Sequence, residues 1–277
     1  MRALVLSGGA AKGGYQVGVL NKWILKDETD YDIFIGTSIG NLNGGFLAQA
    51  PRGELPIWQR KLDNLWRGFK NDDVYRKWFF CELAAVWKWS VYNTEGARNI
   101  IHSNIDPDAL CGSGRKFRTV YVSWRTGAVQ VGTEQDSDIR DKMYASASFP
   151  VFFEPAVVDG ELCTDGGVRD IAPIGLALEL GASEVDVVLC SNPDSPDDWS
   201  TNMPGVLPYA LRTVDIMSTE ILLNDVKMCL LKNRLPEYAH VELRLVKPTR
   251  PLGDSFDFSP KQTERRIEIG YEDACDL

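Results

Sequence analysis

Two short motifs contain residue types that could carry out nucleophilic catalysis. Ser38 stands between Gly36 and Gly40 in "GTSIG", after a short apolar run and before a small-residue helical pattern. Where a strand turns sharply into a helix, small flanking residues let the backbone double back and expose the serine oxygen. Asp165 opens "DGG", and a carboxylate fixed by a tight turn can act as a general base. Each motif also has a simpler interpretation, a helix cap for Ser38 and an ordinary turn for Asp165.

A glycine-rich loop, "SGGAAKGG" at residues 7–14, could supply the third part of such a site. Acyl transfer needs main-chain N–H groups aimed at the oxygen where negative charge develops, and glycines leave those groups unobstructed. A phosphate-binding loop is the competing interpretation. It is the weaker one, because Gly14 stands where a nucleotide loop has Lys and then Ser or Thr, and no G-x-G-x-x-G register fits.

The segments that must position these motifs predict an α/β fold. Strands are predicted at short apolar runs, residues 2–7, 31–36 and 185–191. Helices are predicted where apolar residues follow helical spacing, at residues 15–25, 38–50 and 173–181. Strands that are apolar on both faces fit a sheet covered by helices on both sides.

Further elements are predicted around this framework. Residues 116–124 and 127–132 are typical of paired strands, and Asp159-Gly160 is a hairpin-turn signal. Ser259 and Pro260 predict the start of a helix near the end of the chain. A long helix is expected over residues 205–234, with a core-facing side formed by Leu207, Ala210, Leu211, Val214, Met217 and Ile221.

Together, the glycine loop, "GTSIG" and "DGG" resemble the motifs of the patatin-like phospholipase family, specifically over residues 1–50 and 144–180. "SASFPVFFEP" at 146–155 is similar to the stretch before that family's catalytic aspartate. The resemblance implies one three-layer α/β domain over residues 1–277, with a central, mostly parallel sheet flanked by helices. It also implies a lipid acyl hydrolase in which Ser38 and Asp165 form a catalytic dyad through an acyl-enzyme, without histidine, metal or organic cofactor.

The same resemblance implies roles for the residues around the dyad. Gly8, Gly9 and Ala10 would form the oxyanion hole, and the supporting residues would be Lys12, Gly13, Gly36, Gly40, Gly166 and Gly167. The chain departs from the family pattern at Ala10, where the family loop has a third glycine. Because alanine tolerates positive φ poorly, Gly8 and Gly9 are the expected donors. A second departure is Ile171, two residues before Pro173, where the family often has Asn.

Two alternatives remain open. Ser38, Asp165 and His240 follow the chain order of an α/β-hydrolase triad, although the serine comes after only two predicted strands. His240 lies in "HVELRLV", an alternating strand pattern in which a structural histidine is common, and His102 is predicted to lie near a helix end. The other alternative is a storage or effector-binding protein with little activity. "LGDSF" at 252–256 is interpreted as a turn.

Composition limits the partners. The net charge of −9 argues against nucleic acid, and no apolar run reaches the roughly 20 residues of a membrane-spanning helix. The six cysteines form no C-x-x-C pair, so no zinc site is expected. We expect a cytoplasmic protein that contacts membranes transiently and acts on membrane or micellar lipid. The segment at about 54–92 holds five of the eight tryptophans and predicts either a lid or interfacial patch, or a helix packed on the core.

Overall fold

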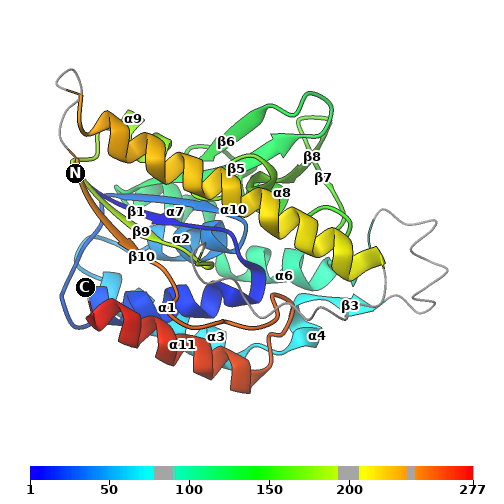
Figure 1. The fold of residues 1–277 in the computed structure, drawn as a ribbon, viewed down its shortest axis with the longest axis horizontal. Coiled ribbons are helices and arrows are strands. Elements are labelled where there is room, and N and C mark those ends of the chain that lie inside the picture. Colours follow the sequence, from blue (N-terminus) through cyan, green and yellow to red (C-terminus); the bar gives the residue numbers. More distant parts are fainter. Residues whose placement is uncertain (78–89, 91, 193–205, 236–240, 277) are drawn as a thin grey trace.

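The computed structural model describes residues 1–77, 90, 92–192, 206–235 and 241–276 (Figure 1). Its centre is an eight-stranded sheet in the order β10-β9-β1-β2-β5-β8-β7, with β6 paired to β5. The strands of this sheet are β1 (Arg2–Leu6), β2 (Ile33–Thr37), β5 (Lys116–Ser123), β6 (Val129–Thr133), β7 (Ala156–Val158), β8 (Glu161–Asp165), β9 (Glu184–Val188) and β10 (Glu242–Val246). A separate antiparallel pair consists of β3 (Arg76–Lys77) and β4 (Tyr92–Asn93).

The sheet changes direction at β5. The pairings from β10 through β9, β1 and β2 to β5 are all parallel, whereas β6 and β8 pair with β5 in the antiparallel direction. The predicted strand pair β5–β6 is therefore confirmed. The predicted hairpin between β7 and β8 is also confirmed, with φ values of 51° at Asp159 and 79° at Gly160, as a two-residue hairpin turn requires.

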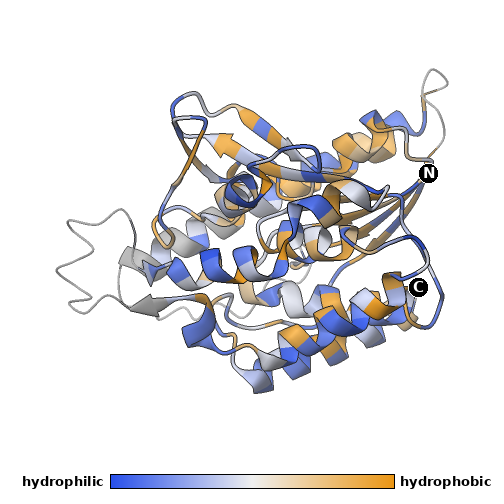
Figure 2. Ribbon diagram, turned by 180° about the vertical axis from the view of Figure 1, so that it is seen from behind, coloured by the Kyte–Doolittle hydropathy of each residue, from blue (hydrophilic) through white to orange (hydrophobic). Residues whose placement is uncertain are grey.

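Helices cover both faces of this sheet. The α-helices are α1 (Gly13–Trp23), α2 (Ile39–Ala48), α3 (Leu55–Gly68), α4 (Asn71–Val74), α6 (Glu95–Asn104), α7 (Pro107–Gly112), α8 (Ile139–Ala147), α9 (Ile174–Glu179), α10 (Val206–Lys232) and α11 (Pro260–Cys275). Two short 3-10 helices, η1 (Ala10–Lys12) and η2 (Gly166–Val168), complete the list. In Figure 2 the outer helices carry hydrophilic and hydrophobic stripes, as expected for helices that bury one side.

Alternate residues of β1 enter two separate cores. Leu4 and Leu6 pack in the core on the side of α1, α2, α3 and α11, whereas Ala3 and Val5 pack in the core on the side of α9 and α10. This alternation follows from the pleat, because successive side chains of a strand point to opposite faces. The predicted three-layer α/β fold with a mostly parallel sheet is confirmed.

Helices α1 and α11 approach each other through two glycines. A Cβ atom at Gly18 would lie 2.0 Å from the Ile267 carbonyl oxygen, and one at Gly270 would lie 2.1 Å from the Tyr15 carbonyl oxygen. Only glycine fits at these crossings. The close contact holds α11 directly behind the helix that follows the glycine-rich loop.

The tryptophan-rich segment begins with a helix that packs on the core. In α3, Leu62 and Trp66 are buried, and the half-buried Trp58 ring lies 5.3 Å from the Phe46 ring, measured between centroids. Core packing therefore accounts for α3. The other tryptophans of the segment, Trp78, Trp87 and Trp89, lie outside the described residues.

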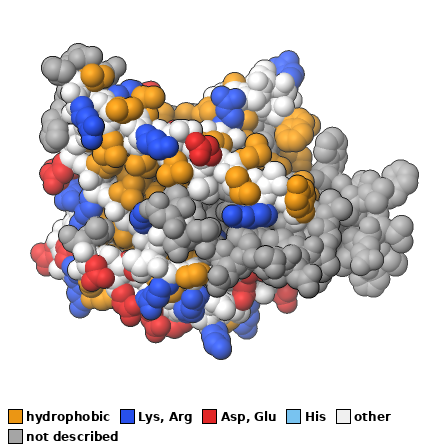
Figure 3. Space-filling model, viewed as in Figure 1, with side chains coloured by type: hydrophobic (Ala, Val, Ile, Leu, Met, Phe, Trp, Pro, Cys, Tyr) orange, Lys and Arg blue, Asp and Glu red, His pale blue; other side chains and the backbone are white. Residues whose placement is uncertain are grey.

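Helix α10 has the predicted bounds to within two residues. Of the residues predicted to face the core, Met217 does not, whereas the side chains of Leu207, Ala210, Leu211 and Val214 lie outside the described part of the structure. Met217 is 60% exposed, whereas Ser218, Leu222 and Cys229 are buried. The helix lies diagonally across one side of the molecule (Figure 1), and hydrophobic side chains are visible on that side of the surface (Figure 3). Because apolar residues occur around much of α10, spacing alone did not select one side. Along the described residues, no helix has both the length and the apolar character to span a bilayer.

Candidate active site

The ends of two strands bring Ser38 and Asp165 together. Residues 118–120 of β5 pair with β6 on one edge and β2 on the other, while residues 121–122 pair with β6 and β8. Strands β2 and β8 therefore occupy the same edge of β5 and meet end to end. Thr37 pairs with Val120 and Asp165 with Tyr121, which are neighbours about 3.3 Å apart along the strand.

Ser38 occupies the strained turn that the sequence predicted. Its φ and ψ are 54° and −126°, a backbone conformation that side chains rarely adopt and that exposes the serine at the start of α2. The two glycines of the motif are required by close contacts, because a Cβ at Gly36 would lie 2.3 Å from the Gly40 carbonyl carbon. The Ser38 amide donates to the Ser146 Oγ at 3.0 Å, which holds the turn against α8.

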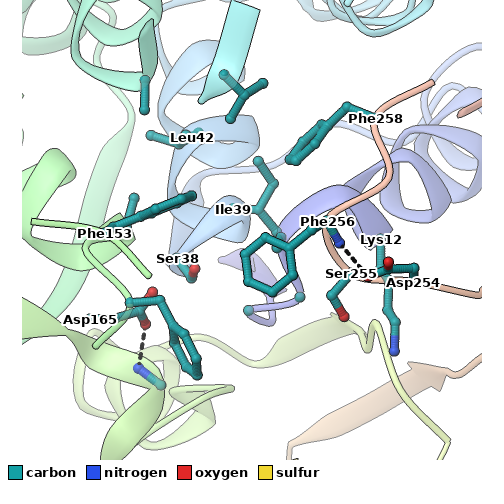
Figure 4. Close-up of a pocket in the computed structure, with 18 of the residues that line it drawn as sticks. Lys12, Ser38, Ile39, Leu42, Phe153, Asp165, Asp254, Ser255, Phe256 and Phe258 are labelled. Atoms are coloured by element: carbon teal, nitrogen blue, oxygen red, sulfur yellow. Dashed lines mark hydrogen bonds between the residues drawn. The ribbon is translucent and has the colours of Figure 1, made fainter. Parts of the chain in front are cut away.

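Asp165 is buried and held from both sides. Its Oδ1 accepts a hydrogen bond from the Gly167 amide at 2.7 Å, and its own amide donates to the Ser148 carbonyl oxygen at 3.1 Å. The turn needs Gly166, because a Cβ there would lie 2.3 Å from the Val120 carbonyl oxygen. Among the described residues, Oδ2 has no well-aligned hydrogen-bond donor. In Figure 4 this carboxyl group lies beside Ser38.

The surroundings of Asp165 raise its pKa. Burial raises the pKa of this carboxyl from 3.8 to about 7, while the Ser38 hydroxyl and the Gly167 amide act in the opposite direction. A base whose pKa lies near neutral pH is ionised at that pH and still accepts a proton readily. The arrangement can therefore deprotonate Ser38 without a histidine.

The glycine-rich loop passes next to Ser38, but the donors differ from those expected. A Cβ at Gly8 would lie 3.2 Å from the Ser38 Cβ. The Gly8 amide already donates to the Ile171 carbonyl oxygen at 3.0 Å, so it is used by the fold. No described residue offers an acceptor to the amides of Gly9 and Ala10. Ala10 does adopt a positive φ of 49°, the conformation for which the family pattern has glycine.

The supporting residues occupy tightly packed positions. A Cβ at Gly9 would lie 2.4 Å from the Cys190 Cβ, and one at Gly13 would lie 2.5 Å from Ile39 Cγ1. Lys12 is buried, lines the pocket described next, and closes the loop through a hydrogen bond from its amide to the Gly9 carbonyl oxygen at 3.0 Å. These contacts fix the path of the loop beside the serine.

A pocket of about 650 Å³ opens beside Ser38 and Asp165. Its lining is mostly apolar, and Figure 4 shows Ile39, Leu42 and Phe153 around Ser38. The cavity can accommodate a long apolar group with its reacting end at the serine oxygen. In the described ranges, no group of three or more His, Cys, Asp or Glu side chains could hold a metal ion.

One wall of the pocket was missed by the sequence analysis. Asp254, Ser255, Phe256 and Phe258 line the cavity, although "LGDSF" was interpreted only as a turn. The segment is anchored by the residue that follows α4, because the Tyr75 hydroxyl donates to the Phe256 carbonyl oxygen at 2.5 Å. In the sequence, only the two phenylalanines of this polar loop, Phe256 and Phe258, could have indicated a buried role.

Of the two histidines, His102 is the one that the structure describes, and it does not line the pocket. His102 is exposed in the last turn of α6, as predicted for a helix-end residue. His240 lies outside the described residues.

These features define an α/β protein with a serine and an aspartate over an apolar cavity. The sequence profile of the family described as "Patatin-like phospholipase" matches residues 4–178, so the chain belongs to this family. It is 26% identical over 212 residues to lysophospholipase NTE1 of Mycosarcoma maydis, which covers 73% of this chain. The chain spans only about 10% of that relative's length. Among solved structures, VipD from Legionella pneumophila aligns with 99% of this chain and 66% of its own, with a TM-score of 0.46 and 14% identity.

The raised pKa of Asp165 predicts the pH dependence of any reaction that uses it as a base. Because the carboxyl must be ionised to accept the Ser38 proton, we expect kcat/KM for ester hydrolysis to fall about tenfold per pH unit below about pH 7. A profile measured from pH 5 to 9 with a soluble ester checks this. A rate that stays constant down to pH 5 would contradict the assignment of Asp165.

Proposed function

We propose that this chain hydrolyses the fatty-acyl esters of lipids, with Ser38 as nucleophile and Asp165 as general base. The single observation that carries this proposal is the half-buried Ser38 at a strained turn, beside a buried carboxyl group, at an apolar cavity of about 650 Å³. Membership of the patatin-like phospholipase family supports the proposal. So does the similarity to a lysophospholipase.

The proposed reaction has two halves. Asp165 Oδ2 accepts the Ser38 proton as Oγ attacks the ester carbonyl carbon, and the amides of Gly9 and Ala10 stabilise the oxyanion. The intermediate then collapses, Asp165 donates the proton to the leaving alcohol, and an acyl-enzyme remains. In the second half, water attacks the acyl carbon while Asp165 accepts its proton. The fatty acid leaves as the proton returns to Ser38.

The cavity lining favours an acyl chain as the group that is recognised. Apolar side chains such as Ile39, Leu42 and Phe153 offer no partner to a charged or strongly polar group, and burying an alkyl chain gains about 0.8 kcal/mol per CH₂. We propose membrane or micellar phospholipid or lysophospholipid as the substrate, reached by transient contact with the lipid surface. A cytoplasmic location and the absence of a nucleic-acid partner belong to the same proposal, based on the net charge of −9.

The proposal is tested by removing the serine and, separately, both histidines. Fatty-acid release from mixed phosphatidylcholine and lysophosphatidylcholine vesicles is measured, together with covalent labelling by a fluorophosphonate probe. We expect Ser38→Ala to lose labelling and at least about 10⁴-fold in rate. Because the chain has only two histidines, the double variant His102→Ala/His240→Ala contains none and should keep the wild-type rate.

Other outcomes would favour the alternatives. Loss of activity in the folded histidine-free variant would support a triad that uses His240. A folded wild type that neither labels nor releases fatty acid would support a storage or effector-binding role. Circular dichroism of each variant shows whether the chain is folded.

A further inference from the structure

A single buried arginine connects the glycine-rich loop to the missed wall of the pocket. Arg266 lies on α11 and is fully buried, with 0% exposure. Burying a guanidinium group costs several kcal/mol unless its donors are bonded. Among the described residues, its nitrogen atoms donate only to main-chain carbonyl oxygens. Arg266 therefore holds main-chain segments in place through hydrogen bonds.

The four acceptors belong to two segments far apart in the sequence. One is the carbonyl oxygen of Ala11 in the glycine-rich loop, at 3.2 Å from Nη1. The other three are the carbonyl oxygens of Leu252, Asp254 and Asp257, at 2.9, 2.6 and 2.6 Å. These three belong to residues 252–258, which we call the wall segment. Each nitrogen of the Arg266 guanidinium group donates to one carbonyl oxygen of the wall segment.

Ala11 is held at both of its polar groups by this arrangement. Its amide donates to the Ser255 carbonyl oxygen of the wall segment at 2.9 Å, and its carbonyl accepts from Arg266. The residue just before it, Ala10, has a positive φ of 49°, which is unfavourable for a residue with a side chain. The loop therefore needs an external restraint next to Ala10, and the bonds to Ala11 provide one.

We propose that Arg266 is a positioning residue for the reaction at Ser38: it holds Ala11 and the wall segment together so that the amides of Gly9 and Ala10 point at the oxyanion. This inference rests on the proposed function. It also implies that the site includes part of the chain well beyond residues 4–178, the range that matches the family profile.

A positioning role differs from a purely structural one in its kinetic signature. The amides of Gly9 and Ala10 would act on the transition state, so loosening them lowers kcat and leaves KM nearly unchanged. The Tyr75 hydroxyl bonds to the same wall segment, at the Phe256 carbonyl oxygen, and not to the glycine-rich loop. Tyr75→Phe should therefore change KM more than kcat.

The experiment compares wild type, Arg266→Lys, Arg266→Gln, Tyr75→Phe and Arg250→Ala. Arg250→Ala is the matched control, because Arg250 joins the same region to Glu272 of α11 through an exposed ion pair. We measure the rate of fluorophosphonate labelling, and kcat and KM on a soluble butyrate ester. We expect Arg266→Lys and Arg266→Gln to lose about 10- to 100-fold in labelling rate and in kcat, while KM stays within about twofold of wild type. The expected loss in kcat is smaller than that caused by removing an oxyanion donor altogether.

A measurement on the wild type alone covers the case in which both Arg266 variants fail to fold. Hydrogen exchange followed in low denaturant should show residues 8–12 and 252–258 losing protection together, because they share one set of hydrogen bonds. Independent exchange of the two segments would overturn the inference.

The remaining outcomes separate this inference from the proposed function. If wild type labels and the folded Arg266 variants label at the wild-type rate, the positioning role is wrong and the hydrolase proposal stands. The positioning role is also wrong if those variants raise KM at unchanged kcat. If wild type itself does not label, the hydrolase proposal and the inference that rests on it fail together.

Discussion

Replacing Asp165 by Asn should lower fatty-acid release by about 10³- to 10⁴-fold, because the amide cannot accept the Ser38 proton. The shape of the side chain is kept, and its oxygen can still accept the hydrogen bond from the Gly167 amide. The turn that holds Ser38 is therefore expected to remain intact. The loss should appear in kcat, as expected for an interaction that matters only in the transition state.

The same variant should be more stable than wild type at pH 8. The folded pKa of Asp165, about 7, lies above its ordinary value of 3.8, so the stability it contributes is present below about pH 4 and is lost as pH rises through about 7. Asparagine does not ionise, so the Asp165→Asn variant does not lose this stability as the pH rises. We expect a gain in the free energy of unfolding of up to about 4 kcal/mol at pH 8, which shrinks as pH falls towards 4.

Urea unfolding at pH 8 and pH 5 measures this change. The matched control is Asp159→Asn in the β7–β8 hairpin turn, where asparagine also tolerates the positive φ of 51°. That variant should keep both activity and stability. An active Asp165→Asn enzyme would contradict the proposed base. Lower stability at pH 8 would contradict the raised pKa.

Replacing Gly40 by Ala should damage both the fold and the reaction. The new Cβ would lie 2.2 Å from the Leu6 carbonyl oxygen in the central strand β1, where neither backbone can move freely. We expect a loss of about 3 kcal/mol in the free energy of unfolding. The displaced start of α2 would also move Ser38, and a shift of about 1 Å at a reacting group can cost about 100-fold in rate.

Gly44, one turn later on α2, is the control for this prediction. A Cβ there would lie no closer than 3.7 Å to another atom, which is an ordinary contact. Gly44→Ala should raise the stability by about 0.5–1 kcal/mol, because alanine favours a helix over glycine. Thermal unfolding and kcat of the two variants are compared. Equal stability of Gly40→Ala and wild type would show that the turn is not as tightly packed as described.

Local motifs explain why the proximity of Ser38 and Asp165 could be predicted from the sequence. Ser38 and Asp165 lie in short segments whose glycines are required by nearby backbone, so the signal is contained within a few residues. The strands and helices next to these motifs were likewise predicted, because their hydrophobic patterns are strong. The hydrogen bond from the Gly8 amide to the Ile171 carbonyl oxygen could not be predicted in this way, because Ile171 lies 163 positions later.

Long-range contacts explain what could not be predicted. Phe256 lines the pocket, and Arg266 of α11 bonds to main-chain oxygens on both sides of it and to Ala11, 255 positions earlier, but neither residue stands in a motif. On α10, helical spacing placed Met217 toward the core, whereas Met217 is exposed and Ser218 beside it is buried.

Strands β2 and β8 meet end to end on one edge of β5, and this arrangement affects the order of events as the chain folds. Thr37 and Asp165 become neighbours only when residues 120 and 121 have paired with both, across separations of more than 40 residues. Such non-local pairing forms slowly, whereas helices form early. In the proposed mechanism, labelling of Ser38 should therefore return only after β2 and β8 have both paired with β5, later than most of the helical signal.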